Sequence, residues 1–327
     1  MSQLQQEPNQ QEQSKYENKV SLLINSGAMA DKGWKPEKTK HKTQHCLKIW
    51  KRLQGDIEYT RSRVSYRKLK LKRKGKKLEV LKAAKEGVVE NFKVIESSKN
   101  HHAIVDRYGE VLGYRCPIKP ELLETLKNST SNLPRKRRRA GVRGSYPTRH
   151  YTVWRDYALV PRESSEFKRD LPASREWCKE NAKLFQFLSD GLRMISPKVY
   201  ARYAGVKPYL EKEVNLKPLC GVWFGAAINE EVTGSTSTHL DWGDHGFNCV
   251  VPWGEYEGGG LVLWPLKMVV KLQPGDAFFF MGSLIAHNVY EVIRVRHSID
   301  LFCHKTMLTW KDKCKEAEKE SWKGETN

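Results

Sequence analysis

The region from Leu219 to Leu308 constrains the fold most, because short apolar segments alternate there with glycine-containing turns. The eight segments are LCGVWFGAAI, HLD, FNCVVPWG, LVLWPL, KMVVKLQ, DAFFFMG, AHNVYEVI and RHSIDLFCHKTML. Short segments of this kind, separated by turn residues, indicate a compact antiparallel sandwich or barrel. The stretch 273-QPGDAFFF-280 adds a turn that is typical of a jelly roll. We therefore expect a core of eight short strands.

Helical patterns flank this core. Residues 174–197 predict one long amphipathic helix that Ser174 opens, and residues 120–127 predict a second, shorter helix. Residues 46–57 also have apolar residues at helical spacing, at Leu47, Trp50, Leu53 and Ile57. Residues 101–115 predict a β-hairpin with its turn at 107–109. These elements place the chain in the α+β class, with flanking helices around a double-stranded β-helix.

Charge divides the chain unequally. Residues 1–150 hold 35 Lys and Arg against 15 Asp and Glu, whereas residues 151–327 hold 23 against 23, so the first part carries the whole net charge of +20. Such a basic half indicates a polyanionic partner, most commonly nucleic acid, although a merely solvated charged surface is the alternative. The expected divisions are a disordered tail at 1–40, a basic and mostly helical region at 41–150 with an exposed basic linker at 131–149, the core domain at 151–308, and a charged tail at 309–327.

Cysteine usage and hydropathy restrict the class of protein. Seven cysteines are scattered without a CxxC pair, which argues against a disulfide framework and a zinc ribbon. No apolar run is long enough for a membrane span, and the Gln-rich N-terminus lacks a hydrophobic signal core. The cluster 134-PRKRRRAGVRG-144 matches a nuclear-import signal at least as well as a phosphate-binding arm. We therefore expect a nuclear protein that has no membrane association.

The stretch 236-TSTHLDWGDHGFN-248 contains histidines and aspartates, the residue types that bind metal ions. Residues i and i+2 of a strand point to the same face, so His239 and Asp241 would share one space. His287, near the start of a later strand, is the obvious second histidine. Two histidines and one carboxylate form the facial triad of non-haem Fe(II) oxygenases, which leaves the other coordination positions open.

The strand 296-RHSIDLFCHK-305 carries a second functional pattern. Its alternation places Arg296, Ser298, Asp300, Phe302 and His304 on one face. A guanidinium on the inner face can hold a carboxylate through two parallel hydrogen bonds, and so can anchor a dicarboxylic cosubstrate whose keto-acid end binds iron. The alternative is that Arg296 forms an ion pair with Asp300 or Asp276.

From Leu219 to Leu308 the chain resembles the TET/JBP family of 2-oxoglutarate- and Fe(II)-dependent dioxygenases, in particular its compact fungal and protist members. The motifs that carry the resemblance are HLD, PGD, AH and R-x-S-x-x-x-F-x-H-K. The resemblance implies Fe(II) ligands, a 2-oxoglutarate clamp and contacts to a flipped base. The ligands would be His239, Asp241 and His287, the clamp Arg296 and Ser298, and the base contacts Asp244, Phe302 and His304. Asp300 and Gly234 depart from the family pattern, and His245 is expected to be a loop residue rather than a fourth ligand.

The resemblance implies oxidation of the methyl group of 5-methylcytosine in flipped-out DNA bases, with the basic half contacting the phosphates. N6-methyladenine or thymine oxidation stays open, as does a 2-oxoglutarate oxygenase that acts on a protein or a small molecule. A third alternative is a nucleic-acid-binding jelly roll with a vestigial metal site. The sequence does not determine the oligomeric state.

Overall fold

The structure is a computed structural model that describes residues 57–72, 77–85, 88–141, 143–155 and 157–324. Contacts divide the chain into residues 1–42 and residues 43–327, and all described residues belong to the second unit. The expected tail at 1–40 and the helical spacing from Leu47 to Leu53 therefore lie outside the described residues. Ile57, the last residue of that spacing, is described and begins a strand rather than continuing a helix.

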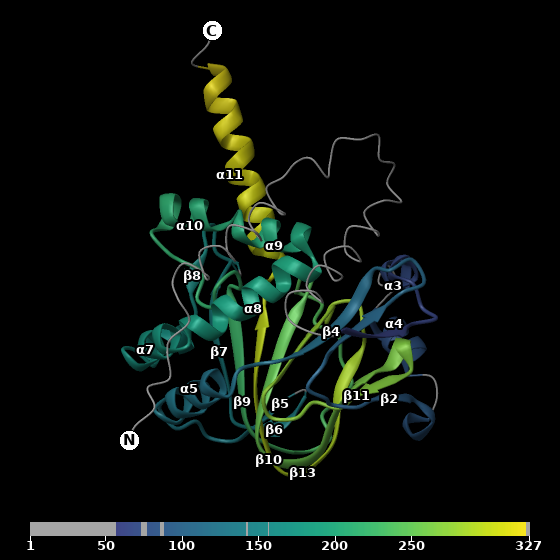
Figure 1. Ribbon diagram of the computed structural model, residues 1–327. Helices are drawn as coiled ribbons and strands as arrows, with labels where there is room; N and C mark the ends of the chain where they lie inside the picture. Colours follow the sequence, from purple (N-terminus) through teal and green to yellow (C-terminus); the bar gives the residue numbers. More distant parts are fainter. Residues whose placement is uncertain (1–56, 73–76, 86–87, 142, 156, 325–327) are drawn as a thin grey trace, which may run out of the picture. The chain divides into compact units, whose positions relative to one another are not determined.

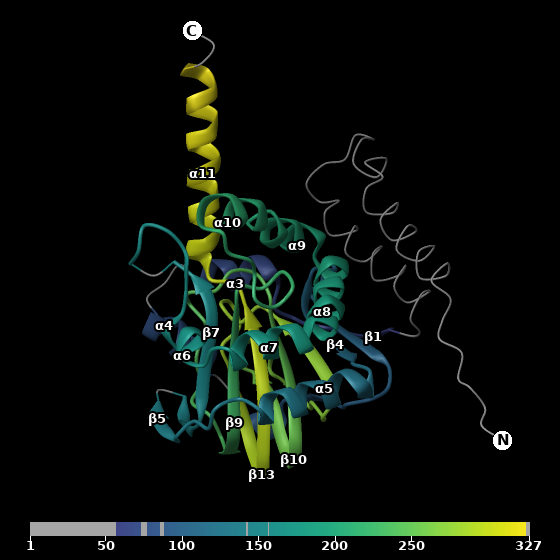
Figure 2. The ribbon, with the colours of Figure 1, turned by 90° about the vertical axis from the view of Figure 1, so that its left-hand side faces the viewer.

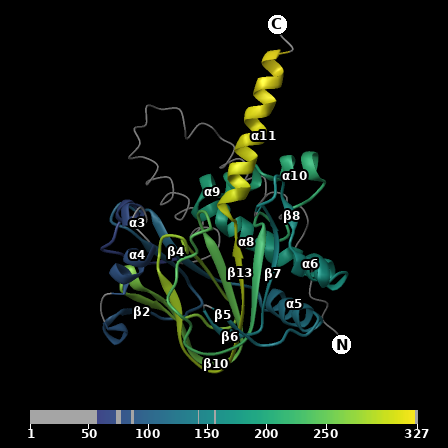
Figure 3. The ribbon, with the colours of Figure 1, turned by 180° about the vertical axis from the view of Figure 1, so that it is seen from behind.

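Eleven of the described strands form one main sheet, and two more form a separate hairpin (Figures 1 and 3). The order across the main sheet is β1 (Ile57–Arg61), β3 (His101–Val105), β4 (Val111–Pro117), β12 (Asp276–Phe280), β10 (Asn248–Leu263), β13 (His287–Phe302), β9 (Gly225–Gly234), β7 (Thr148–Trp154) and β8 (Arg162–Glu163). Strand β11 (Met268–Val270) pairs with both β10 and β2 (Lys93–Ile95). The predicted α+β class with a jelly-roll core is confirmed.

The expectation of eight short strands between Leu219 and Leu308 is wrong, because the described chain has five there. Strands β10 and β13 each join two of the expected segments into 16 residues, and they pair with each other from Cys249–Leu301 to Leu263–His287. Gly258 and Gly259 have φ of 70° and 63°, so β10 bends at these glycines without ending. The 3-10 helix η3 (Trp264–Leu266) then connects β10 to β11.

The region at 41–150 is not mostly helical where it is described. It contributes β1, β3 and β4 to the main sheet, with β1 parallel to β3 and β4 antiparallel to β12. The hairpin predicted at 101–115 is confirmed as β3 and β4. Helices in this region are α3 (Tyr66–Lys72), α4 (Lys77–Ala84), the 3-10 helix η2 (Val89–Asn91) and α5 (Pro120–Ser131). A buried ion pair of 3.0 Å between Arg115 and Asp276 ties β4 to β12, so no domain boundary lies at residue 150.

Helices cover one face of the sheet, as Figure 2 shows. The single helix predicted at 174–197 is wrong, since the chain forms α7 (Ala173–Glu180) and α8 (Ala182–Ile195) with a break at Asn181. The amide of Asn181 donates hydrogen bonds to Ser129 Oγ at 2.7 Å and to the Trp177 carbonyl at 2.8 Å. Because Ser129 belongs to α5, the residue at the break connects α7 and α8 to α5. The remaining helices are α6 (Ser165–Arg169), α9 (Pro197–Ala204) and α10 (Lys207–Val214).

Two further segments differ from expectation. The segment at 309–327, expected as a charged tail, is helical to residue 324 as part of α11 (Lys305–Gly324), which projects away from the sheet in Figure 1. The segment at 131–149 is not only an exposed linker, because it contains the hairpin of β5 (Arg139–Gly141) and β6 (Gly144–Tyr146) and the start of β7. None of the described helices has the length and hydrophobicity needed to cross a bilayer.

Candidate metal centre

Three side chains with metal-binding atoms converge at one end of the jelly roll. The Nε2 atom of His239 lies 3.8 Å from Asp241 Oδ1, and the Nε2 atom of His287 lies 3.6 Å from Asp241 Oδ2. The candidate ligand atoms of all three residues lie within 4.8 Å of one another. This arrangement suits one metal ion held by two imidazoles and one carboxylate.

The backbone around His239 is extended but does not form the strand that the sequence predicts for the HLD segment. His239 forms an isolated bridge with His287, the first residue of β13, and their backbone N–H groups donate to each other's carbonyls at 3.0 Å. The extended backbone retains the alternation of side chains, so His239 and Asp241 still share one space. The predicted grouping is therefore correct although the predicted element is not.

Hydrogen bonds orient both imidazoles for metal binding. The Nδ1 atom of His239 lies 2.8 Å from the Ser237 carbonyl, and that of His287 lies 2.8 Å from the Ile285 carbonyl. A carbonyl only accepts, so each Nδ1 carries the proton and each Nε2 keeps its lone pair toward Asp241. Burial lowers the pKa of His239 to about 3 and also lowers the pKa of His287. Both rings are therefore neutral at pH 7, as metal ligands must be.

Asp241 is ionised in this site. Burial by itself would raise the pKa of its carboxyl, but His287 and Arg143 outweigh burial and lower the pKa. The Nη2 atom of Arg143 donates to Asp241 Oδ1 at 2.6 Å, and the amide of Asn248 donates to Oδ2 at 3.3 Å. The carboxylate is thus fixed by neighbours while it faces both histidines.

Arg296 and Ser298 lie on β13 and are buried, with exposed fractions of 2% and 3%. Within the described residues, the Nε and Nη2 atoms of Arg296 have no hydrogen-bond partner. The alternative ion pairs are not formed, because Asp276 binds Arg115 and no ion pair joins Arg296 to Asp300 in the described part of the chain. Buried cationic donors without a partner are costly, so these two nitrogens fit an anionic ligand.

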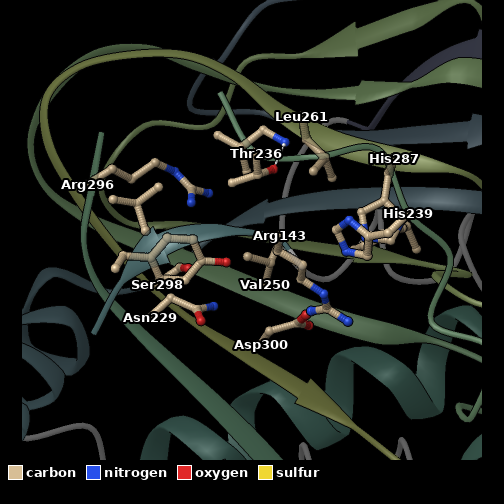
Figure 4. A pocket seen from close by; sticks show the side chains of 14 residues that line it. Arg143, Asn229, Thr236, His239, Val250, Leu261, His287, Arg296, Ser298 and Asp300 are labelled. Atoms are coloured by element: carbon tan, nitrogen blue, oxygen red, sulfur yellow. Dashed lines mark hydrogen bonds between the residues drawn. The ribbon is translucent and has the colours of Figure 1, made fainter. Parts of the chain in front are cut away.

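One pocket connects the histidines to Arg296. Figure 4 shows His239 and His287 at one end of the pocket and Arg296 at the other, with Arg143 and Asp300 between them. Apolar and polar residues from several strands complete the wall; they include Tyr146, Asn229, Val232, Val250, Leu261, Phe280, Val289 and Ser298. A metal site and a carboxylate site within one cavity can hold a single ligand that chelates the metal at one end and carries an anionic group at the other.

Arg143 and Tyr146 are site residues that the sequence interpretation missed. Arg143 lies in the turn between β5 and β6, within the segment expected as an exposed linker, yet it contacts Asp241 98 residues away. Gly141 and Gly144, with two residues between them, form a hairpin signal that could have excluded a simple linker. Nothing local indicates which carboxylate the arginine would contact.

The expected base contacts form a second group beside Asp241, separate from the wall of the pocket. Asp244 and His304 form an isolated bridge, and Asp244 Oδ2 accepts from the Asn248 amide at 2.8 Å. Burial and then the charge of Asp241 raise the pKa of Asp244 to about 7. Phe302, at the end of β13, is half-buried, and its ring packs against Gly225. Alternation along β13 thus correctly places Arg296, Ser298 and Asp300 in the pocket, whereas Phe302 and His304 lie beyond it.

Asp300 is the unusual residue of the pocket. Its Oδ1 atom is buried and has no hydrogen-bond partner among the described residues. Burial, with Asp241 next, raises the pKa of Asp300 well above its ordinary value. His245 lies outside the triad, as expected for a loop residue; its backbone N–H donates to the Cys303 carbonyl at 2.9 Å.

Solved structures with a similar fold include NgTET1, which was solved in complex with 5mC DNA. The match has a TM-score of 0.53 and 16% identity, and it covers 75% of this chain and 93% of that one. The chain has the fold of NgTET1. A 2OG-Fe(II) oxygenase family oxidoreductase from Burkholderia pseudomallei matches with a TM-score of 0.39 and 16% identity, over 58% of this chain and 82% of that one. No protein-family model and no curated protein sequence matches the chain.

Proposed function

We propose that the protein is a 2-oxoglutarate- and Fe(II)-dependent dioxygenase that oxidises the methyl group of 5-methylcytosine in DNA. The observation that carries the proposal is the pocket itself. It has a 2-His-1-carboxylate triad at one end and, at the other, two nitrogens of buried Arg296 that have no hydrogen-bond partner among the described residues. A dicarboxylic keto acid has the matching chemistry, since one end chelates a metal and the other accepts two parallel hydrogen bonds.

Five residues have defined parts in this function. His239, Asp241 and His287 would hold Fe(II), and Arg296 with Ser298 would bind the distal carboxylate of 2-oxoglutarate. When bound, the ion and the cosubstrate would supply the oxidising chemistry, with O2 as the oxidant: one oxygen atom of O2 goes to 2-oxoglutarate, which becomes succinate and CO2, and the other goes to the methyl group of the substrate. The protein orients the carboxylate with Arg296 and excludes water from the buried end of the pocket.

A DNA base is the substrate that the second group of residues supports. A stacked base cannot reach a buried site, so the base must flip out of the duplex. Phe302 would stack on the flipped base, while Asp244 and His304 would contact its polar edge. The Asn248 amide occupies one oxygen of Asp244, which leaves the other to accept from the 4-amino group of cytosine. The shared fold with NgTET1, solved with 5mC DNA, supports this assignment.

Exposed cations of the basic region would contact the DNA phosphates. Helix α3 presents Arg67, Lys68 and Lys70 to solvent, and the linker presents Arg135 and Arg137. Phosphate contacts of this kind add affinity without sequence preference. We also propose a nuclear location from the exposed arginines at 135, 137 and 138.

The decisive test is incubation of the purified protein with Fe(II), 2-oxoglutarate, ascorbate and 5-methylcytosine duplex, followed by mass spectrometry of the nucleosides and a succinate assay. We expect 5-hydroxymethylcytosine from the wild type and none from His287→Ala, because that variant lacks one of only three ligands. Equal turnover in His287→Ala would remove His287 from the site. Succinate without an oxidised nucleoside would instead indicate a protein or small-molecule substrate.

The choice of base is tested with Asp244→Asn. The ionised carboxylate of Asp244 only accepts hydrogen bonds, so at a pH above its pKa of about 7 it favours cytosine over thymine, which presents a carbonyl there, by about tenfold to hundredfold. An asparagine amide can donate to that carbonyl, so the variant should have a smaller preference for 5-methylcytosine over thymine. Parallel assays on 5-methylcytosine, thymine and N6-methyladenine duplexes measure it. If the wild type oxidises thymine as fast as it oxidises 5-methylcytosine, Asp244 does not select the base.

A further inference from the structure

The loop between β7 and β8 exposes apolar side chains that the proposed active site does not use. Tyr157 is 104% exposed, Leu159 85% and Val160 48%, and the first two are the largest values among the described large hydrophobic side chains. All three side chains belong to four consecutive residues, 157–160, and exposed apolar side chains that gather in one place commonly mark a binding site. The position of the loop indicates what it binds.

The loop leaves the sheet beside the residues proposed to contact the base. Trp154, at the end of β7, packs edge-on against His304 with ring centroids 5.9 Å apart, and His304 is bridged to Asp244. Strand β8 and the start of α11 lie at the same end of the sheet in Figures 1 and 3. The loop is therefore a neighbour of the base-contacting group rather than of Arg296.

Cations flank the apolar residues. Arg162, the first residue of β8, and Lys305, the first residue of α11, are both exposed, and Lys305 Nζ donates to the Trp242 carbonyl at 3.4 Å. The Nε atom of Arg155 donates to the Ala158 carbonyl at 2.8 Å, which braces the loop from inside. An exposed aromatic and an exposed aliphatic side chain on a loop that leads to a cation match a DNA duplex, whose bases present apolar faces and whose phosphates carry negative charge.

We propose that Tyr157 and Leu159 form a wedge that enters the base stack where the target nucleotide has flipped out. This inference rests on the proposed function, because it requires a DNA substrate. The wedge fills the gap in the stack and so offsets the loss of base stacking, while Arg162 and Lys305 contact the flanking phosphates. Duplex DNA needs the wedge, whereas a single strand, whose base is already accessible, does not.

The test compares wild type, the double variant Tyr157→Ser/Leu159→Ser, and the control Tyr108→Ser, which removes a 44% exposed tyrosine from the β3–β4 turn. The first readout needs no catalysis. A duplex with 2-aminopurine beside the target position reports unstacking by fluorescence, and binding titrations on duplex and single strand give the two affinities. Circular dichroism checks that each variant is folded.

We expect the double variant to lose about tenfold or more of its duplex affinity and the fluorescence increase, with single-strand affinity unchanged. The Tyr108→Ser control should match the wild type in every readout. Equal duplex affinity and fluorescence for wild type and double variant would overturn the wedge, and would assign the loop to a protein partner instead. Turnover on single-stranded 5-methylcytosine tests the proposed function separately, because a wedge defect spares that substrate.

Discussion

At the residue scale, Arg296 is the residue on which the proposed binding of 2-oxoglutarate depends most. Its side chain is 2% exposed, and two of its nitrogens have no hydrogen-bond partner among the described residues. Burial of an unpaired cation costs free energy, and a bound anionic ligand would remove that cost. Replacement by lysine keeps the charge and loses the planar fork. We expect Arg296→Lys to raise the KM for 2-oxoglutarate about tenfold or more, as the loss of one charge-assisted hydrogen bond predicts, with Fe(II) affinity unchanged.

The matched control for this prediction is Arg294→Lys. Arg294 lies on the same strand, but its side chain is 64% exposed and pairs with Glu257 at 3.4 Å. Steady-state kinetics over a range of 2-oxoglutarate concentrations measure both variants. If Arg294→Lys and not Arg296→Lys changes the KM, the clamp belongs to Arg294.

At the element scale, the contact between β9 and β13 sets the position of Phe302. A Cβ atom at Gly225 would lie 2.6 Å from two atoms of the Phe302 ring and 2.9 Å from Thr152 Cγ2. Gly225→Ala should therefore destabilise the fold by about 1–3 kcal/mol and displace the ring. Gly141→Ala is the control, since its Cβ would meet its nearest neighbour at 3.5 Å. Urea unfolding compares the two, and equal stabilities would mean that the ring moves freely.

The hairpin of β3 and β4 contributes a pH dependence. Burial lowers the pKa of His101 from 6.5 to about 4, and its Nδ1 lies 2.7 Å from the Tyr114 hydroxyl. The folded state disfavours the charged form, so the stability contributed by neutral His101 is complete above pH 6.5 and is lost as the pH falls toward 4. Urea unfolding at about pH 7 and about pH 4.5, on either side of the ordinary histidine pKa, should show a larger loss for wild type than for His101→Gln. An equal loss of stability in wild type and His101→Gln would show that His101 does not cause the pH dependence.

At the scale of the whole molecule, the basic region and the catalytic core are one folded unit. Removal of residues 1–150 would remove β1 to β4 from the main sheet and should unfold the protein. Removal of residues 1–42 spares every described strand and should leave a folded protein. That segment holds 7 Lys and Arg against 5 Asp and Glu, so residues 43–150 keep 28 against 10. Circular dichroism and thermal unfolding distinguish the two deletions.

The salt dependence of DNA binding locates the phosphate contacts. The protein without residues 1–42 should keep most of the wild-type slope of log affinity against log salt. The triple variant Arg67→Gln/Lys68→Gln/Lys70→Gln, on exposed positions of α3, should lower the slope by roughly one for each phosphate that the protein no longer binds. An unchanged slope in the triple variant would place the phosphate contacts on other cations.

The sequence by itself determined what local spacing controls. The alternation of strands predicts that His239 joins Asp241 and that Arg296, Ser298 and Asp300 share a face, and the structure confirms both groupings. This holds because the direction of a side chain follows from the backbone of its immediate neighbours. The alternation survives even at His239, where an isolated bridge replaces the expected strand.

Only the tertiary structure decided which distant segments meet. Arg143 contacts Asp241, 98 residues away, and β1, β3 and β4 complete a sheet whose centre lies after residue 225. It also decided that Arg115 pairs with Asp276 and leaves Arg296 without a counter-ion among the described residues. Such pairings depend on the packing of whole strands against one another, and neither periodicity nor the spacing of residues within one segment records them.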